Sequence, residues 1–405
     1  MSYDRYINSK YREGSLLSVP CVALCILLFM ILGFLPALPS SITQLFRPAM
    51  LILNFVFPPV YYYRLGITHK ALILYLVYFL LVFFMHPITR DSAMAYGAVF
   101  LFGAFFIVLT MRPWNRREIQ MILFTAAIAG AVFAVILYNE NPDMLHERRY
   151  GGFLFRENQV NDNTASYTLV PGFLCSLALL LFHKPRSERR RGWNAAVRIA
   201  LLASTVLSAY VLFCIGARSA FFSAALGSVC ICFQKAYSYR TVDARWRARI
   251  SVILLLIVLF VIGMHVTEGT HSSRLFDFEN YTDTNGRDEL ADEAWPMIHK
   301  KPFFGGGYDY WNQEGGSELG THNTFLTIMV RGGYAGALTL FLFLLAFMYE
   351  VLPTRNLLLL SFLIETVFHS LAESDLDYFS YIPLLIVFIL LRYSSTHKCT
   401  VESIL

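Results

Sequence analysis

Charged side chains are scarce in this sequence: Asp, Glu, Lys and Arg make up 15% of its 405 residues, where about 25% is usual for a soluble domain. Hydrophobic residues reach 56% and aromatic residues 16%. A water-soluble chain of this length cannot bury so much apolar surface without exposing large hydrophobic patches. The composition therefore argues against a soluble enzyme, a disordered scaffold and a nucleic-acid-binding protein, and it indicates an integral membrane protein.

Cysteine is rare as well, and its placement is uneven. Two long polar segments, 139–163 and 267–323, contain no cysteine. This absence excludes a disulfide framework and a cysteine-based metal site in either segment. The seven cysteines lie in apolar runs or in the C-terminal tail, at Cys21, Cys25, Cys175, Cys214, Cys230, Cys232 and Cys399.

Long apolar runs are what the sequence has in abundance. A helix that crosses a hydrocarbon core of about 30 Å needs roughly 20 mostly apolar residues. The first run is longer than the apolar core of a signal peptide and no A-x-A site follows it, so it is predicted to be a retained span. The runs predict an all-α polytopic membrane protein of about 12 transmembrane helices, with 1–405 as a single integral membrane domain. They lie at about 15–38, 43–63, 71–86, 93–111, 119–138, 164–183, 199–215, 220–234, 251–266, 324–348, 356–372 and 378–391.

The distribution of charge predicts which side of the membrane each loop faces. With the N-terminus placed in the cytoplasm, the cytoplasmic segments hold about 22 of the 33 Lys and Arg residues, and the opposite segments hold about 20 of the 28 acidic residues. This asymmetry follows the positive-inside rule and predicts that both termini are cytoplasmic. The basic loops are expected to set this topology and to contact anionic lipid headgroups, not nucleic acid.

Two predicted extracytoplasmic segments are long enough to build a site: 139–163, and 267–323 between helices 9 and 10. A long loop that is neither disordered in composition nor a separate domain is usually functional. Within the second segment, 288–299 has the pattern of a short amphipathic helix, with Leu290, Ala294 and Ile298 on one face. The aromatic residues near it suit the membrane interface: Trp295, Phe303, Phe304, Tyr308, Tyr310 and Trp311.

A third outer feature is the very short turn GARSAF, which joins the seventh and eighth runs and contains Arg218. A cation on the outer face runs against the positive-inside bias. Its side chain either snorkels to the headgroups or belongs to a functional site, as is common for an arginine held near the bilayer. The turn by itself leaves both readings open.

Four motifs follow one another along about 148–336. RRYGGF begins at Arg148-Arg149 and is followed by Asn161 or Asn163; the turn around Arg218 comes next. Gly286-Arg287 precedes Trp295 and PFFGGG at 302–307, and His322-Asn323 is followed after nine residues by Gly333 and then by Gly336. In this order the motifs resemble those of the O-antigen ligase and O-antigen polymerase superfamily, including its H-[N/S/Q]-x9-G-x-x-G pattern.

The resemblance implies an activity. Members of this superfamily transfer a glycan from an undecaprenyl-diphosphate carrier to an acceptor on the outer face of the bacterial inner membrane. The chain is therefore expected to be a multi-pass glycosyltransferase of that membrane, with an active site formed by its two long extracytoplasmic loops. The expected partners are an undecaprenyl-diphosphate-linked oligosaccharide donor, a glycan or lipid A-core acceptor and the lipid bilayer. A chain-length regulator protein is a further partner that the resemblance allows, and no cofactor is implied.

The resemblance also implies roles for individual residues. Arg218 and Arg287 are expected to bind the diphosphate, because a guanidinium stays charged and pairs bidentately with phosphate. His322 is expected to be the general base, since a neutral imidazole suits proton abstraction near neutral pH. Inversion at the anomeric carbon and a mechanism without metal are expected, as arginines offset the charge of the leaving group. Further substrate contacts are expected from Arg149, Arg148, Asn323 and Asn161.

Several alternatives stay open. One sequence does not separate a polymerase of O-antigen, capsule or exopolysaccharide, which is slightly favoured, from a ligase that joins glycan to lipid A-core. A polytopic transporter or lipid flippase is a reading of another class, and the concentration of ionisable residues in the outer loops argues against it. Arg331 is expected to have a buried protein partner, and Gly332-Gly333 is expected to kink its helix. Glu365 and His369 share a helix face and either form a buried polar pair, which is slightly favoured, or line the acceptor cavity.

Overall fold

The fold is described here from a computed structural model of the chain. It describes residues 19–34, 66–90, single positions between 92 and 107, 114–144, 153–155, 158–160, 162–182, 191–237, 241–267, 275, 287–316, 321–354, 356–372, and 386–391 without 388.

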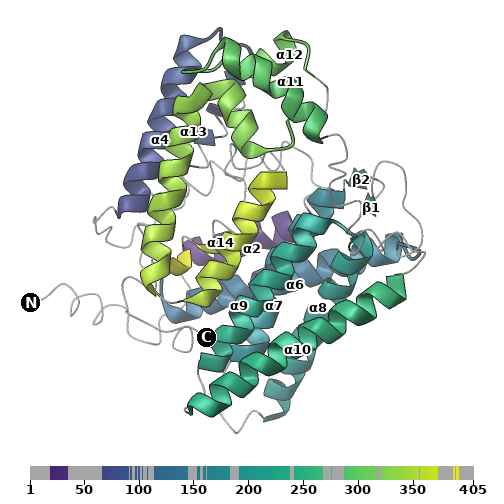
Figure 1. The fold of residues 1–405 in the computed structure, drawn as a ribbon. Helices are drawn as coiled ribbons and strands as arrows, with labels where there is room; N and C mark the ends of the chain where they lie inside the picture. Colours follow the sequence, from purple (N-terminus) through teal and green to yellow (C-terminus); the bar gives the residue numbers. More distant parts are fainter. Residues whose placement is uncertain are drawn as a thin grey trace, which may run out of the picture.

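Helices dominate the described residues (Figure 1). They are α2 (Val19–Phe34), α4 (Ile67–Met85), α6 (Arg116–Glu140), α7 (Asp162–Phe182), α8 (Arg191–Ile215), α9 (Arg218–Tyr237), α10 (Val242–Thr267), α11 (Arg287–Lys300), α12 (Tyr310–Gln313), α13 (Thr324–Val351) and α14 (Leu357–Ala372), with a 3-10 turn at Leu352–Thr354.

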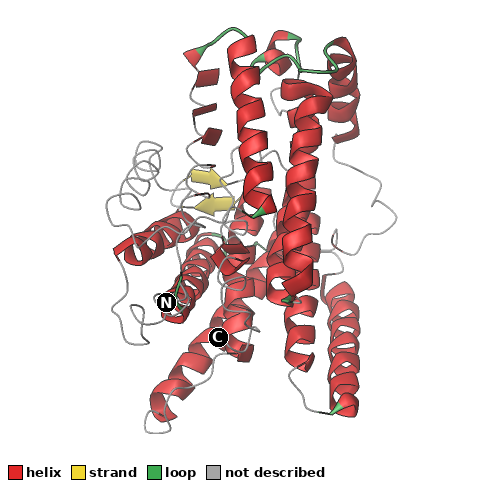
Figure 2. Cartoon of the chain, turned by 90° about the vertical axis from the view of Figure 1, so that its left-hand side faces the viewer, coloured by secondary structure: helices red, strands yellow, loops and turns green. Residues whose placement is uncertain are grey.

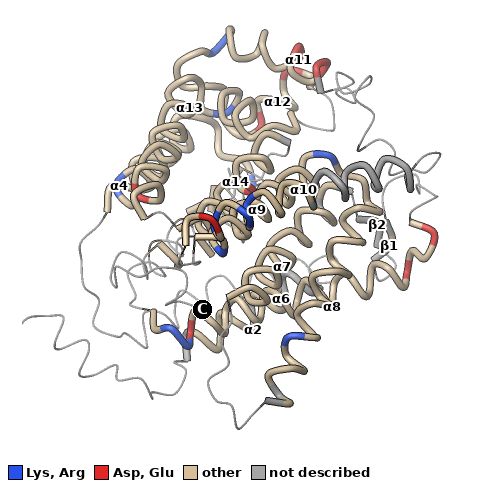
Figure 3. Tube along the Cα trace, turned by 60° about the horizontal axis from the view of Figure 1, so that its bottom comes forward, with Lys and Arg blue, Asp and Glu red and all other residues tan. Residues whose placement is uncertain are grey.

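The predicted helical membrane architecture is confirmed in its coarse form. Within the described residues, six helices are long and apolar enough to cross a membrane, and Leu357–Leu371 is a shorter apolar helix. Figure 3 shows long uncharged stretches of chain, with acidic residues gathered on α11. The run at 43–63 and most of the runs at 93–111 and 378–391 lie outside the described residues. The count of twelve spans stays a prediction.

Apolar side chains on the outside of the helices explain why this chain needs a membrane. On α4, Leu72, Phe79 and Val82 are buried against the rest of the protein, whereas Leu81 and Phe84 point outward and are exposed. A helix that is apolar all round is typical of a membrane span. The same sequence in water would expose this outer face at a large cost in free energy.

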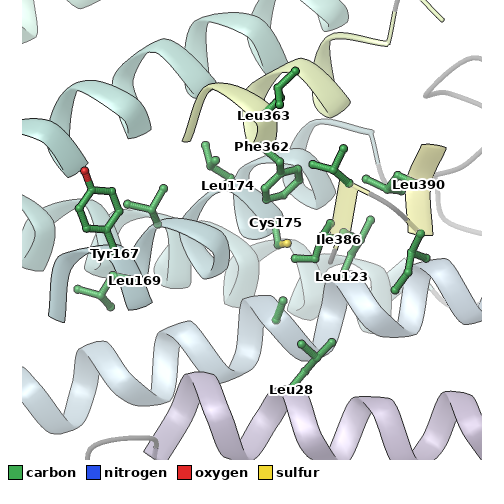
Figure 4. Packing of buried hydrophobic residues seen from close by; sticks show 14 of the residues in the cluster. Leu28, Leu123, Tyr167, Leu169, Leu174, Cys175, Phe362, Leu363, Ile386 and Leu390 are labelled. Atoms are coloured by element: carbon green, nitrogen blue, oxygen red, sulfur yellow. The ribbon is translucent and has the colours of Figure 1, made fainter. Parts of the chain in front are cut away.

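A helical bundle is built around α6, α7, α9 and α14. Figure 4 shows Leu174 and Cys175 of α7 packed near Phe362 of α14, with Leu123 of α6 and Leu28 of α2 on the other side of the same cluster. Small residues let α6 and α7 approach closely. A Cβ atom on Gly130 of α6 would lie 2.7 Å from the Cα of Gly172 in α7.

A second pair, α4 and α13, lies side by side, with α11 and α12 over one end (Figure 1). At the opposite end, the Thr68 hydroxyl of α4 donates to the Ala346 carbonyl of α13 at 3.2 Å. Because Thr68 begins α4 and Ala346 stands late in α13, the two helices run antiparallel.

A short β-hairpin departs from the all-α prediction. Strands β1 (Phe153–Phe155) and β2 (Asn158–Val160) pair antiparallel, with Phe153 opposite Val160, and Figure 2 shows them in yellow among the helices. The buried Asn141, at the end of α6, receives a hydrogen bond from the Leu154 amide at 3.0 Å and donates to the Leu154 carbonyl at 2.8 Å. One asparagine thus ties the hairpin to the end of the bundle.

Candidate functional site

The packing of α9 against α14 sets where Arg218 lies. The Leu357 amide, at the start of α14, donates to Gln234 near the end of α9 at 2.8 Å. Further along, a Cβ atom on Gly227 would lie 3.4 Å from the Cβ of Ser361. The two helices are therefore antiparallel, and the first residue of α9, Arg218, lies beside the C-terminal end of α14.

The same end of α14 holds the residue next to His322. The Asn323 side-chain amide donates to the carbonyl of Leu371, in the last turn of α14, at 3.3 Å. From Gly227 back to Arg218 the rise along α9 is about 13 Å, and from Ser361 on to Leu371 the rise along α14 is about 15 Å. The fold thus gathers Arg218 and the His322-Asn323 pair, more than 100 residues apart in sequence, at one end of α14.

Arg218 begins a helix, and this position adds to its positive field. Gly216, two residues before it, has a φ of 68° and makes the tight turn out of α8, a conformation that glycine adopts without a steric penalty. Arg218 is half-buried at the N-terminus of α9. Free backbone N–H groups at a helix N-terminus favour anions, so the location suits a phosphate.

His322 has a strained backbone. Its φ is 43°, a positive value found at no other non-glycine position among the described residues, and such strain in a native fold is often linked to function. Neighbouring side chains hold the turn. The Asn323 side-chain oxygen caps α13 by accepting from the Phe325 amide at 2.9 Å and the Leu326 amide at 3.2 Å. The Thr321 hydroxyl contacts the hydroxyl of Thr327 and donates to the Asn323 carbonyl at 3.1 Å.

Asn323 therefore uses both ends of its side chain on the protein itself. Its oxygen caps α13 and its nitrogen bonds α14. We infer that it orients the His322 turn, while the expected sugar contact stays a prediction.

Buried polar groups lie behind this turn. Glu365 and His369 of α14 are 0% and 4% exposed, and the ring of His369 lies 3.8 Å from that of Tyr167 in α7, centroid to centroid. Tyr167 stands near the start of α7, so this end of α7 also faces the group. Their burial agrees with the slightly favoured prediction of a polar pair packed between helices.

Arg287 is the first residue of α11, and its side chain lies outside the described part of the structure. The amphipathic pattern predicted for this helix is confirmed. Leu290, Ala294 and Ile298 are buried against α13, in a small cluster that also holds Met297, Tyr310, Trp311 and Val330.

The prediction that all the aromatic residues of this segment suit the interface was wrong for two of them. Tyr310 and Trp311 are buried, because they fill the core between α11, α12 and α13. Trp295, Phe303 and Phe304 are 40%, 70% and 50% exposed. These three still fit the predicted interfacial location.

The expected kink of α13 is present at Gly333, whose φ of 65° and ψ of −168° interrupt the helix. The loop at 302–307, PFFGGG, fills the break. The amides of Gly306 and Gly307 donate to the carbonyls of Val330 and Arg331, both at 3.0 Å. In return, the amides of Tyr334 and Ala335 donate to the carbonyls of Pro302 and Phe303 at 2.7 and 3.3 Å. Sequence reasoning found both segments but missed that they interlock.

Side chains around this loop also have partners on neighbouring elements. The guanidinium of Arg331 lies over the ring of Tyr308, 4.3 Å from its centroid, which agrees with the predicted protein partner. The Thr89 hydroxyl donates to the Asp309 carboxylate at 2.6 Å.

His86, just beyond α4, is a residue that sequence reasoning missed, although it directly follows an apolar run. Burial and the nearby ammonium of Lys301 lower the pKa of its imidazole, because both disfavour the charged form. It contacts the loop at Gly307, where a Cβ would lie 2.8 Å from the imidazole ring.

Some predicted site residues are not placed. Arg148, Arg149 and Asn161 lie outside the described residues, so their substrate contacts stay predictions. Asn163 is described, and its carbonyl accepts from the Ser166 hydroxyl at 2.9 Å in the first turn of α7.

Comparison with known proteins adds an independent finding. Residues 203–341, about a third of the chain, match the family described as O-antigen ligase. This range contains Arg218, Arg287, the loop at 302–307 and His322, but not the hairpin region. A comparison with curated proteins gives no match. Over 203–341, the chain is therefore similar to the O-antigen ligase family, in agreement with the resemblance of its motifs.

Proposed function

We propose that the protein is a glycosyltransferase of the bacterial inner membrane that polymerises undecaprenyl-diphosphate-linked glycan units at the extracytoplasmic face, to make O-antigen, capsule or exopolysaccharide. One observation carries the proposal: the family match spans Arg218 and His322, and α14 brings the ends of both their helices together. The proposal includes twelve spans, cytoplasmic termini and no metal ion or cofactor in the mechanism.

The two arginines would bind the leaving group. Arg218 and Arg287 are each the first residue of a helix, so each guanidinium adds to the positive potential of a helix N-terminus. A diphosphate gains negative charge as its bond to the anomeric carbon breaks. Fixed positive groups at that point stabilise the transition state more than the ground state.

His322 would accept the proton of the attacking hydroxyl. The acceptor oxygen forms a bond to the anomeric carbon, the bond from that carbon to the diphosphate oxygen breaks, and the proton passes to the imidazole. The lipid diphosphate leaves with the electron pair of the broken bond. Attack opposite to the leaving group inverts the anomeric configuration.

A ligase that joins glycan to lipid A-core is the second candidate, because the matching family is described as O-antigen ligase. Both reactions share the donor and differ in the acceptor. The purified protein, given only a defined lipid-linked repeat unit, should produce a ladder of products if it is a polymerase. A ligase would leave the repeat unit unchanged until lipid A-core was added.

Substitution of the proposed catalytic groups tests the mechanism. His322→Ala should lower the transfer rate about 10²–10⁴-fold, the usual contribution of general base catalysis, and Arg218→Ala should lower it about 10²–10³-fold. His299→Ala and Arg117→Ala, both at exposed positions, are matched controls and should keep full activity. Normal product amount and length with His322→Ala would remove the histidine from the mechanism.

A further inference from the structure

The loop at 302–307 replaces the hydrogen bonds that α13 loses at its break. In a continuous α-helix the amides of Tyr334 and Ala335 would bond to the carbonyls of Val330 and Arg331, four residues earlier. Here those two carbonyls accept from Gly306 and Gly307, and the two amides donate to Pro302 and Phe303. Every group freed in these two pairs therefore has a backbone partner on the inserted loop.

Tyr78 of α4 completes the exchange. The carbonyl of Gly332, the residue just before the break, accepts a hydrogen bond from the Tyr78 hydroxyl. The same hydroxyl lies 3.5 Å from the Phe303 carbonyl. The point where the 302–307 loop crosses α13 is called the crossing below. Tyr78 stands seven residues before the end of α4, so this crossing lies about 10 Å inside that end. Irregular backbone at such depth needs internal partners, and loop and tyrosine supply them.

Glycine is required where the two segments cross. A Cβ atom on Gly333 would lie 2.6 Å from the Pro302 carbonyl oxygen, and closer still to Phe303. A Cβ atom on Gly305 would lie 2.5 Å from the Gly332 nitrogen, and closer still to Arg331. Both glycines also have a φ near 65°, where other residues are strained. The crossing is thus a fixed joint between two backbones.

This joint holds the half-helix that carries the proposed base. The first half of α13, from Thr324 to Gly332, is fixed at one end by the bond from Asn323 to Leu371 and at the other by the crossing. It also packs against α11, which begins with Arg287 and ends just before the inserted loop.

We propose that the crossing sets the spatial relation between His322 and the Arg287 helix, and that Tyr78, Gly305 and Gly333 are positioning residues for the transfer. This inference rests on the function proposed above. It assigns these three residues no contact with substrate. Their loss moves the general base relative to the bound diphosphate, and a shift of about 1 Å can lower a rate about 10²-fold.

The glycines provide the first test. Gly305→Ala and Gly333→Ala should each lower kcat at least about 100-fold, with the donor KM changed less than about twofold. Gly315→Ala is a matched control, because Gly315 also has a positive φ, of 80°, but a Cβ there would meet nothing within 4 Å. The kcat of Gly315→Ala should stay within about threefold of that of the parent protein. Equal losses in all three variants would overturn the role of the crossing.

Tyr78→Phe is the sharper variant, since it removes one hydroxyl and leaves the ring. It should lower kcat about 10-fold with an unchanged donor KM in protein that still folds, although the lost hydrogen bond to Gly332 lowers its thermal stability. Tyr349→Phe, at an exposed position on α13, should have no effect. In a His322→Ala background, Tyr78→Phe should cause no further loss of the residual rate, because the group it positions is already gone.

The outcomes separate this inference from the proposed function. An equal 10-fold loss in both backgrounds, or a rise in donor KM with unchanged kcat, would overturn the positioning role and leave the proposed function standing. Full activity of His322→Ala itself would overturn the assignment of the base, and the inference would fall with it.

Discussion

At the scale of single residues, the turn at His322 shows how a strained backbone is kept in place. A φ of 43° is unfavourable for histidine, and the turn persists because Thr321, Asn323 and Thr327 bond to one another and to the start of α13. Asn323 contributes most to holding this turn, since its side chain caps α13 and donates a hydrogen bond to the last turn of α14. The Asn323 side chain thus fixes the turn that contains the proposed base.

Substitutions of Asn323 separate these two bonds. Asn323→Ala should lower the free energy of unfolding by about 1 kcal/mol, the usual effect of losing an N-cap, and should lower activity as well. Asn323→Asp keeps the capping oxygen and should restore most of the stability but not the bond to Leu371. Thermal unfolding in detergent and the transfer rate measure the two effects.

Asn115 is the control for the cap alone, because its side chain caps α6 by accepting from the Glu118 amide at 3.0 Å. Asn115→Ala should cause a similar loss of stability with normal transfer by the folded protein. A similar loss of transfer in both alanine variants would show that Asn323 has no special relation to the site.

At the scale of elements, close helix contacts depend on small residues. Gly130 of α6 and Gly172 of α7 face each other where the two helices cross, and a Cβ atom on Gly172 would lie 2.6 Å from the Cα of Gly130. In a membrane, packing at such crossings is a main source of helix association. Because α7 carries Tyr167 against His369, the crossing also supports the candidate site from behind.

Gly130→Ala or Gly172→Ala should therefore destabilise the bundle by about 1–3 kcal/mol, the usual effect of overpacking. Gly192→Ala, on α8, adds the same methyl group where nothing lies within 4 Å, and it should be neutral or slightly stabilising. Unfolding curves in detergent compare the three variants. Stability unchanged by Gly172→Ala would contradict the close crossing.

At the scale of the whole molecule, the charge asymmetry predicts that the loop before α13 and the C-terminal tail lie on opposite sides of the membrane. Cysteine labelling tests this. Gln313→Cys, at an exposed position on α12, should react with a membrane-impermeant maleimide in spheroplasts when Cys399 is replaced by Ser. The natural Cys399 should react only after permeabilisation. Labelling of both positions in spheroplasts would contradict the three spans predicted between them.

Much of the helical layout was predictable, because a membrane span needs a long run of apolar residues and such a run is visible in the sequence. The apolar run at 119–138 became α6, and the pattern of Leu290, Ala294 and Ile298 correctly predicted the buried face of α11. The kink at Gly333 was also expected from its paired glycines. In contrast, the hairpin at 153–160 was missed, since three-residue strands carry too few residues to show a pattern.

The candidate site was predictable only as a set of residues. The order of the motifs identified Arg218, Arg287 and His322 as candidate site residues, and the family match covers all three. Tyr78 was missed because a tyrosine inside an apolar run looks like any other core or lipid-facing residue. Three consecutive glycines at 305–307 were the one signal that a backbone passes close by, and they did not say which backbone.

By itself, the sequence determined three things: that the chain is a membrane protein, which segments form its main helices, and which family it resembles. Hydropathy, charge and motif order are local properties of a chain, so they can be read without a structure. Only the tertiary structure decided that the 302–307 loop completes α13 and that α14 joins the end of α9 to the turn at His322. Each of those contacts has, on at least one side, a backbone group that any residue possesses. Helix packing determines which groups become partners, and the sequence pattern alone does not show how the helices pack.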